Sequence, residues 1–201
     1  MILIIDYGAG NLHSVQKAFE YLGVPARITT NPADIGSVEK ILLPGVGAFG
    51  KGMEDLRQHA FVEAIGEHVD KGKQLFGICL GMQLLFTESE EIGVHKGLNL
   101  IPGAVKRFDD RAAKVPQIGW NSLNFHRDSP IFKGIDENTY FYFVHSFYCQ
   151  PNDSSSLTAS ASYAQIDFCA ALEKDGIFAV QFHPEKSSAF GLKVLENFAK
   201  Y

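Results

Sequence analysis

Cysteine is scarce in this 201-residue chain: Cys79, Cys149 and Cys169 stand at unrelated spacings. An odd number without a CxxC pattern offers neither a disulfide framework nor a metal motif, and the histidines also lack paired ligand spacing. We therefore expect no metal and no cofactor, and a location in a reducing compartment, the cytoplasm.

A basic excess and a long hydrophobic run are also missing. Lys and Arg total 18 against 23 Asp and Glu, for a formal charge of −5, which disfavours a nucleic-acid partner. No apolar run approaches the roughly 18 residues of a membrane helix. The start, Met1–Ile5, has no basic leader and reaches Asp6 too early for a secretory signal. We expect a soluble intracellular protein without membrane or nucleic-acid partners.

Short apolar strands alternating with helical patterns are present in the first half. This order predicts a mainly parallel sheet with helices on both faces. The second half holds mostly strand patterns, which predict added antiparallel strands. We find no repeat or long linker and predict one domain over residues 1–201. The predicted strands are 2–5, 26–29, 40–43, 74–78, 104–108, 122–125, 140–144, 158–163, 169–172 and 177–182; the predicted helices are 12–22, 53–58, 61–69, 80–86 and 188–201.

One cysteine lies between a predicted strand and a predicted helix, in the segment Gly77-Ile78-Cys79-Leu80-Gly81. This is the G-x-S-x-G form of a nucleophile elbow with sulfur in place of oxygen, and its glycines let the chain turn tightly. The N–H groups at a helix start favour a thiolate. The alternative is a buried structural cysteine, the role that we assign to Cys149 and Cys169.

A nucleophilic cysteine needs a base and an orienting group. His183 directly follows an apolar strand pattern, where a parallel sheet presents catalytic groups, and Glu185 is close enough in sequence to hold its imidazole. A His-x-Glu pair alone is usually a solvated turn, so this prediction depends on Cys79. The N–H of Leu80 is the expected first oxyanion donor. The turn at residues 44–47 is able to aim a second one, although alone it reads as a plain turn.

Together these motifs resemble those of the class I (triad) glutamine amidotransferases. The resemblance extends to the glutaminase subunits of imidazole glycerol phosphate synthases and spans nearly the whole chain in order. It implies a flavodoxin-like α/β fold, with an open, mainly parallel twisted sheet, helices on both faces and added antiparallel strands. The blocks that carry it are 6–11 (DYGAGN), 43–50 (LPGVGAFG), 77–83 (GICLGMQ), 118–121 (IGWN), 142–146 (YFVHS) and 182–187 (FHPEKS).

The resemblance also implies residue roles. Cys79 attacks the side-chain amide of glutamine, His183 acts as base and then as acid, and Glu185 orients His183. Ammonia leaves, and water hydrolyses the thioester to glutamate. The implied oxyanion donors are Leu80, Val46 and Gly47, and the implied substrate-binding residues are Gly45, Gln83, His145, Ser146 and Phe147, the last at a position where the family often carries tyrosine.

A partner is implied as well, because the chain has no room for a phosphate-binding barrel. In the family this partner is a (β/α)₈ cyclase subunit, which forms a heterodimer and uses the ammonia to make imidazole glycerol phosphate in histidine biosynthesis. We expect slow glutamine hydrolysis by the chain alone. Asn11, Trp120 and Lys186 are the candidate interface residues, with a surface or core role as the alternative for each.

Three other functions remain open on the sequence alone. One is a class I glutaminase of another synthase, such as anthranilate or pyridoxal phosphate formation, which blocks 119–121 and 142–146 disfavour. Another is a non-catalytic binding subunit, which the intact set of Cys79, His183 and Glu185 disfavours. The last is a cysteine peptidase, to be separated by comparing free glutamine with peptides.

Overall fold

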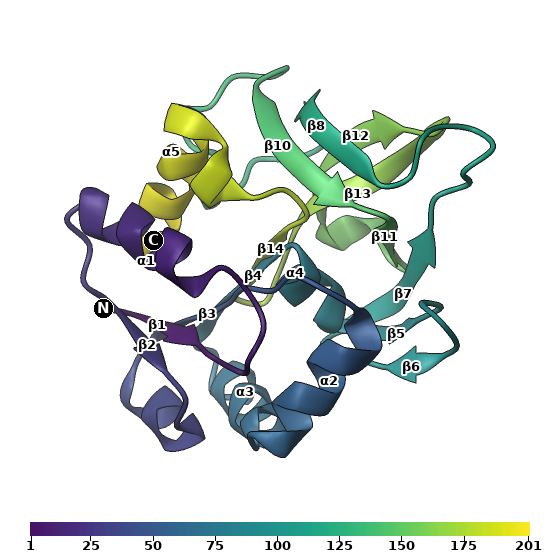
Figure 1. The fold of residues 1–201 in the computed structure, drawn as a ribbon. Coiled ribbons are helices and arrows are strands. Elements are labelled where there is room, and N and C mark those ends of the chain that lie inside the picture. Colours follow the sequence, from purple (N-terminus) through teal and green to yellow (C-terminus); the bar gives the residue numbers. More distant parts are fainter.

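A computed structural model describes all residues, 1–201 (Figure 1). Its main sheet has 12 strands, in the order β2-β1-β3-β4-β14-β13-β11-β7-β5-β6, with β12 beside β13 and β9 beside β12. The strands of this sheet are β1 (Ile2–Ile5), β2 (Ala26–Thr29), β3 (Lys40–Leu43), β4 (Gln74–Ile78), β5 (Phe86–Ser89), β6 (His95–Lys96), β7 (Ile101–Arg107), β9 (Asn124–Phe125), β11 (Phe147–Pro151), β12 (Leu157–Tyr163), β13 (Ile166–Lys174) and β14 (Ile177–Val180).

The first part of the sheet is parallel: β2, β1, β3, β4 and β14 pair in one direction. β1, β3, β4 and β14 are short, apolar and almost entirely buried, because helices cover both faces, whereas the edge strand β2 is mostly not buried. Alternate side chains of β1 enter different cores: Ile2 and Ile4 join one cluster, and Leu3 and Ile5 join the other. The expected mainly parallel sheet is confirmed.

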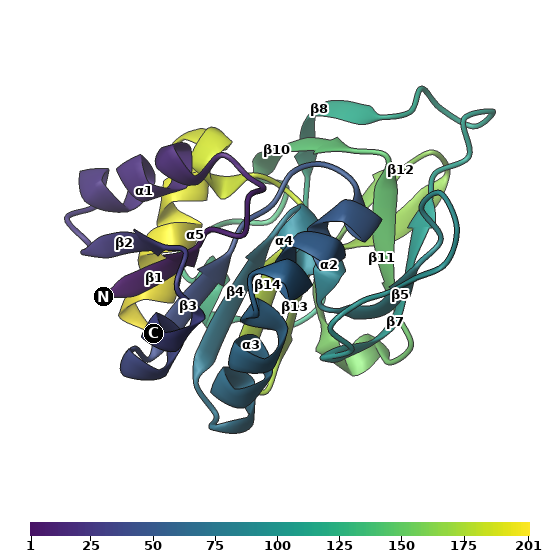
Figure 2. The same ribbon diagram turned by 60° about the horizontal axis from the view of Figure 1, so that its bottom comes forward.

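The helices divide between the two faces (Figure 1; Figure 2). α1 (Leu12–Tyr21) and α5 (Ser188–Lys200) pack on the face of Ile2 and Ile4. α2 (Phe49–Gln58), α3 (Phe61–Asp70) and the short α4 (Leu80–Leu84) cover the opposite face. Apolar helix faces on both sides of the sheet therefore bury its central parallel strands, β1, β3, β4 and β14.

The added strands lie in the second half, as expected. β13 is antiparallel to β14, β12 and β11 and so extends the parallel sheet. β8 (Gln117–Ser122) and β10 (Tyr140–His145) form a separate antiparallel ribbon. Figure 1 shows this ribbon above the carboxyl ends of the central strands. The ribbon therefore adds a wall to the edge where the parallel strands end.

Some predicted elements differ from the structure. The helix expected over 80–86 ends at Leu84, because Phe86 begins β5 and pairs with β7. The strand expected over 122–125 is divided between two strands: Ser122 ends β8, and Asn124 and Phe125 form β9. Strands β5, β6, β8 and β11 were not predicted as strands. None of the helices has both the length and the hydrophobicity required to span a lipid bilayer.

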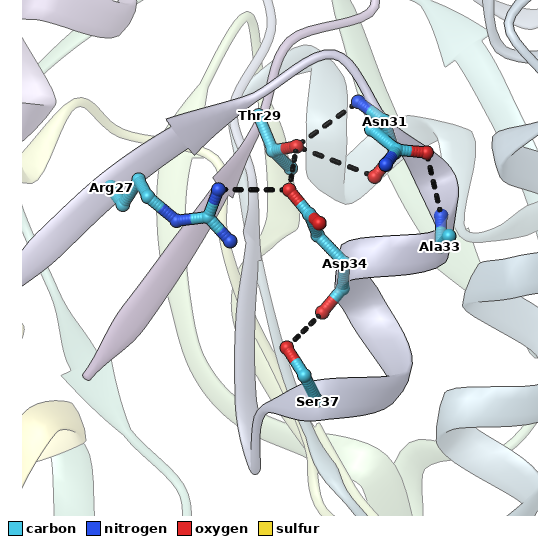
Figure 3. A network of polar contacts seen from close by, with 6 residues as sticks. All are labelled: Arg27, Thr29, Asn31, Ala33, Asp34 and Ser37. Atoms are coloured by element: carbon cyan, nitrogen blue, oxygen red, sulfur yellow. Dashed lines mark hydrogen bonds and ion pairs between the residues drawn. The ribbon is translucent and has the colours of Figure 1, made fainter.

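A polar network fixes the connection between β2 and β3 (Figure 3). Asp34 accepts hydrogen bonds from Thr29 Oγ1 at 2.6 Å and from Arg27 Nη1 at 2.9 Å. Asn31 caps the following turn, the 3₁₀ helix η1 (Pro32–Ser37), by accepting the Ala33 N–H. These hydrogen bonds hold the carboxyl end of β2 to the turn that leads into β3.

Candidate active site

Cys79 occupies the corner between β4 and α4, as predicted. Its φ is 54° and its ψ is −109°, a conformation that costs a non-glycine residue about 1–3 kcal/mol. A Cβ on Gly81 would lie 1.8 Å from the Leu43 carbonyl oxygen, and one on Gly77 would lie 3.0 Å from the Met82 backbone. Both flanking glycines are therefore required by close packing, and the corner has the geometry of a nucleophile elbow.

His183 and Glu185 form a buried pair beyond the end of β14. Nδ1 of His183 lies 2.9 Å from Oε1 of Glu185, and their side chains are 3% and 2% exposed. The His183 backbone N–H donates to the Tyr142 carbonyl, which ties this segment to β10. Because Nδ1 faces the carboxylate, Nε2 is the nitrogen left for chemistry, and no group of the chain hydrogen-bonds it.

The surroundings of His183 favour its protonated form. Burial opposes the charge, but the interactions with Cys79 and with Glu185 outweigh it and raise the pKa of His183 to about 10 from its ordinary 6.5. An imidazolium beside Cys79 in neutral solution stabilises a thiolate. The structure therefore brings together the three residues that the sequence predicts as a triad.

A cavity of about 340 Å³ opens over Cys79 and His183. The sulfur-bearing residue is only 6% exposed, so a ligand reaches it through this cavity. The predicted residues that line it are Val46, Gly47, Leu80, Gln83, His145, Ser146 and Phe147, joined by Glu91, Pro116 and Val144. Gly45 lies behind this wall and is buried.

The expected oxyanion donor is engaged in this structure: Leu80 N–H donates to the Gly45 carbonyl at 3.3 Å. In a trans peptide the C=O and N–H point in opposite directions, so the Val46 N–H of the same peptide points away from Leu80. A Cβ on Gly45 would lie 2.4 Å from the Tyr7 hydroxyl and 2.9 Å from Leu80 Cβ. Glycine at 45 therefore permits this close approach, and rotation of the Gly45–Val46 peptide is what would free Leu80.

Gln83 and His145, which line the cavity, hold fixed orientations. Gln83 donates both side-chain hydrogens, to the Phe147 carbonyl and to Gln181 Oε1, each at 3.1 Å. His145 Nδ1 lies 2.8 Å from the same Phe147 carbonyl. Burial lowers the pKa of His145 to about 4, so this imidazole is neutral and donates through Nδ1. Gln83 Oε1 and His145 Nε2 are left as acceptors.

Two residues of the site escaped prediction. Gln181 is fully buried, and its Nε2 lies 3.7 Å from the Cys79 sulfur. Glu91 lines the cavity and accepts the Phe49 N–H at the start of α2. Gln181 lies within the predicted strand 177–182, where a polar residue in an apolar run is the one available signal. Glu91 carries no such signal.

The predicted interface residues lie on exposed parts of the same end of the molecule. Asn11 precedes α1, and Lys186 lies in η4 (Pro184–Lys186), which contacts both α1 and β10. Trp120 is 50% exposed on β8 and packs edge-on against Tyr142, with ring centroids 6.1 Å apart. The core alternative for Trp120 is therefore wrong. Cys149 and Cys169 are buried in the sheet, as their assignment to packing requires.

Comparison with known proteins agrees with this geometry. The family model "Glutamine amidotransferase class-I" matches residues 3–200. Imidazole glycerol phosphate synthase subunit HisH of Chlorobium luteolum is 56% identical over 200 residues, and that of Chlorobaculum tepidum 54% over 201, with 100% of each chain covered. Among solved structures, PurLQS from Thermotoga maritima has a TM-score of 0.80 at 18% identity, covering 100% of this chain and 97% of that one, which shows a shared fold. The chain belongs to the class I glutamine amidotransferases and, among them, to the HisH subunits of imidazole glycerol phosphate synthase.

Proposed function

We propose that this chain is the glutamine amidotransferase subunit of an imidazole glycerol phosphate synthase, with one catalytic domain over residues 1–201. The observation that carries the proposal is the elbow cysteine sharing a cavity with the buried His183–Glu185 pair. Relatives of 54–56% identity over their whole length support the choice of synthase over the anthranilate and pyridoxal phosphate alternatives.

The reaction is hydrolysis of glutamine to glutamate and ammonia. The Cys79 thiolate attacks the side-chain amide carbon, and the amide oxygen takes up the electron pair as an oxyanion. The His183 imidazolium then protonates the leaving nitrogen, and ammonia departs as the thioester forms. Neutral His183 next takes a proton from water, which attacks the thioester and releases glutamate and the thiolate. Glu185 holds Nδ1 throughout, so that Nε2 makes both transfers.

Turnover requires an oxyanion site that the resting arrangement withholds. With the Gly45 carbonyl on Leu80 N–H, the donor next to the nucleophile is occupied. Rotation of one peptide releases it and turns the Val46 N–H toward the same place. Gly47, with a φ of 107°, follows this peptide, and Val46 is 44% exposed at the surface. A partner that binds there is able to drive the rotation, and one such donor is worth about 10²–10³ in turnover.

The α-amino acid end of glutamine fits the polar part of the cavity lining. Its ammonium group needs acceptors, and Glu91 and Gln83 Oε1 supply a carboxylate and an amide oxygen. His145, Ser146 and Phe147 follow one another at the junction of β10 and β11 and line the same cavity as Val46. We assign the carboxylate end of the substrate to this segment.

Ammonia then passes to the cyclase subunit, a (β/α)₈ barrel in a heterodimer. Free ammonia is mostly protonated near neutral pH, and ammonium has no lone pair for attack, so direct transfer protects the product. Asn11, Trp120 and Lys186 provide the contacts with this partner. They are exposed and lie on elements that meet near the carboxyl ends of the central strands.

Glutamine hydrolysis by the wild-type chain and by Cys79→Ala tests this function. We expect the variant to lose thioester formation and at least about 10²-fold in glutaminase rate, measured with the cyclase present. A glutamine-mimicking electrophile should label Cys79 in the wild type alone. Cys149→Ala is the matched control, because Cys149 is buried in β11 and does not line the cavity, and it should retain activity. Unchanged glutaminase activity in Cys79→Ala, or equal cleavage of peptides, would exclude the proposal.

A further inference from the structure

A chain of side-chain amides leads from β11 to the reacting sulfur. It starts at the Phe147 carbonyl, passes through Gln83 and Gln181, and ends at Cys79 Sγ, with successive distances of 3.1, 3.1 and 3.7 Å. Gln181 and Gln83 are both buried, at 0% and 5% exposure. The last distance suits an N–H donor facing the larger sulfur atom. The amides therefore contact one another and the nucleophile without intervening space.

The direction of this chain is fixed at its far end. A backbone carbonyl only accepts, so the Gln83 atom that faces Phe147 must be the amide nitrogen. That nitrogen also faces Gln181, which must therefore present its oxygen there. The remaining atom of the Gln181 amide, its nitrogen, is left to face the sulfur. A flipped Gln181 would place two N–H groups against each other, so the network excludes it.

We propose that Gln181 stabilises the reacting thiolate of Cys79 by donating an Nε2 hydrogen to it, and that Gln83 is a positioning residue that fixes this orientation. A hydrogen bond given to the charged form of an acid favours that form. The hydrogen bond from Gln181 is shielded from solvent, because Gln181 is fully buried. His183 gives up and regains its proton during the reaction, whereas the Gln181 N–H keeps its hydrogen throughout. Gln181 is therefore a second donor to the sulfur that does not change during turnover.

Other titratable groups around the sulfur do not offer an alternative donor in neutral solution. The Tyr7 hydroxyl donates its hydrogen to the Pro44 carbonyl at 2.9 Å and is therefore not available to the sulfur. Burial raises the pKa of both Tyr7 and Cys149, so neither adds a charge near the sulfur in neutral solution. Burial lowers the pKa of His145 to about 4, and its Nδ1 is directed at Phe147. His183 is the charged donor beside the sulfur, and its interactions with Cys79 are among the causes that raise its pKa. A change in thiolate formation on altering Gln181 therefore reports the proposed bond.

The test is the pH dependence of Cys79 alkylation by iodoacetamide, followed by peptide mass spectrometry on the full chain. In Gln181→Met the donor is lost, and we expect the pH midpoint to rise and the rate at neutral pH to fall about 2- to 10-fold. Gln181→Glu keeps the shape but faces the sulfur with oxygen, so its midpoint should rise further. The rate reached at high pH should stay unchanged in both, which a merely structural role would not preserve.

Two further variants sharpen this test. Gln83→Met removes the positioning residue alone and should move the midpoint in the same direction by less. Gln117→Met is the matched control, because Gln117 is a buried glutamine without a hydrogen bond to sulfur, and its profile should superpose on the wild type. Midpoints of Gln181→Met and Gln181→Glu equal to the wild type would overturn the proposal. Should neither fold, the side-chain amide protons of Gln181 in the wild type must shift at the alkylation midpoint, and constant shifts would overturn it.

The inference rests on the proposed function only in taking Cys79 as the nucleophile. Alkylation requires neither glutamine nor a partner subunit. A chain that fails to hydrolyse glutamine but shows the midpoint shift would contradict the proposed function alone. A chain that hydrolyses glutamine without the shift would contradict the role of Gln181 alone.

Discussion

The three cysteines show how environment separates a nucleophile from packing residues of the same type. Burial raises the pKa of Cys149 and Cys169, which keeps both thiols neutral inside the sheet. Cys79 instead has a positive φ, faces a cavity and lies beside a histidine whose pKa is raised. The strain at this corner is retained because the close packing around the flanking glycines determines it.

Glu185→Gln tests the orienting carboxylate. We expect glutaminase kcat to fall by about 10²- to 10⁴-fold, the share that positioned acid–base catalysis supplies, with a smaller change in KM. The pKa of His183 should also fall, because Glu185 helps to raise it to about 10. Stability from protonated His183 is complete below its ordinary value of 6.5 and is lost as the pH rises through about 10. The wild type should therefore exceed the variant in Tm most at pH 6 and least near pH 10.

Glu196→Gln provides the matched control, since Glu196 forms exposed ion pairs on α5 with Lys193 and Lys200. Its kcat and the pH dependence of its Tm should follow the wild type. A Glu185→Gln enzyme with wild-type kcat would contradict the orienting role.

At this scale the sequence was informative where a short motif contains the chemistry. Cys79, His183 and Glu185 each lie in such a motif, and the structure places them together. Gln181 and Glu91 escaped because their contacts join distant parts of the chain. Gln181 meets Gln83 across 98 positions, and Glu91 meets Phe49 across 42. No local pattern encodes a contact made only by the tertiary fold.

At the scale of elements, Asp34 links β2 to the 3₁₀ turn η1 (Figure 3). The hydrogen bond from Thr29, followed by the bond and charge of Arg27, lowers the pKa of this carboxyl below 3.8. Its contribution to stability is therefore present above about pH 3.8 and is lost as the pH falls through the lowered value. We expect Asp34→Asn to lower the Tm by a few degrees at pH 7 and to match the wild type in strong acid.

Thermal unfolding from pH 2 to pH 7 measures this difference. Asp128→Asn, on the exposed loop before the 3₁₀ helix η2 (Pro130–Phe132), is the control and should follow the wild type at every pH. A constant Tm difference for Asp34→Asn across this range would show that its carboxylate charge contributes nothing.

Element prediction succeeded where burial on both faces gives continuous apolar strands, as in β1, β3 and β4. It failed for β5, because four residues that follow an apolar helix carry no strand period of their own. Pairing with β7 makes them a strand. β8 was missed for a related reason. Its apolar residues Ile118 and Trp120 are exposed and do not mark a buried strand face, and the strand forms by pairing with β10 in a ribbon apart from the main sheet.

At the scale of the whole molecule, the sheet and its added ribbon bring the site and the candidate interface to one end. The carboxyl ends of β1, β3, β4 and β14 meet there, as expected for an open α/β sheet. Val46 is exposed beside the cavity, and Trp120 is exposed on the ribbon. A subunit bound at this end is therefore able to contact the peptide that blocks Leu80 N–H.

Partner binding should accordingly raise glutaminase turnover by about 10²–10³, the value of one oxyanion donor, when the cyclase and its acceptor ligand are present.

Trp120→Ala removes an exposed aromatic of the kind that dominates interfaces, and we expect about 30-fold weaker binding of the cyclase. Its basal turnover should stay unchanged, because Trp120 does not line the cavity. Tyr21→Ala, at the far end of α1 and 81% exposed, is the matched control and should bind normally. Titration of the cyclase, read by calorimetry and by glutamate release, gives both quantities. Equal turnover with and without the liganded cyclase would contradict control through the Gly45–Val46 peptide, and equal affinity of Trp120→Ala and the wild type would exclude β8 from the interface.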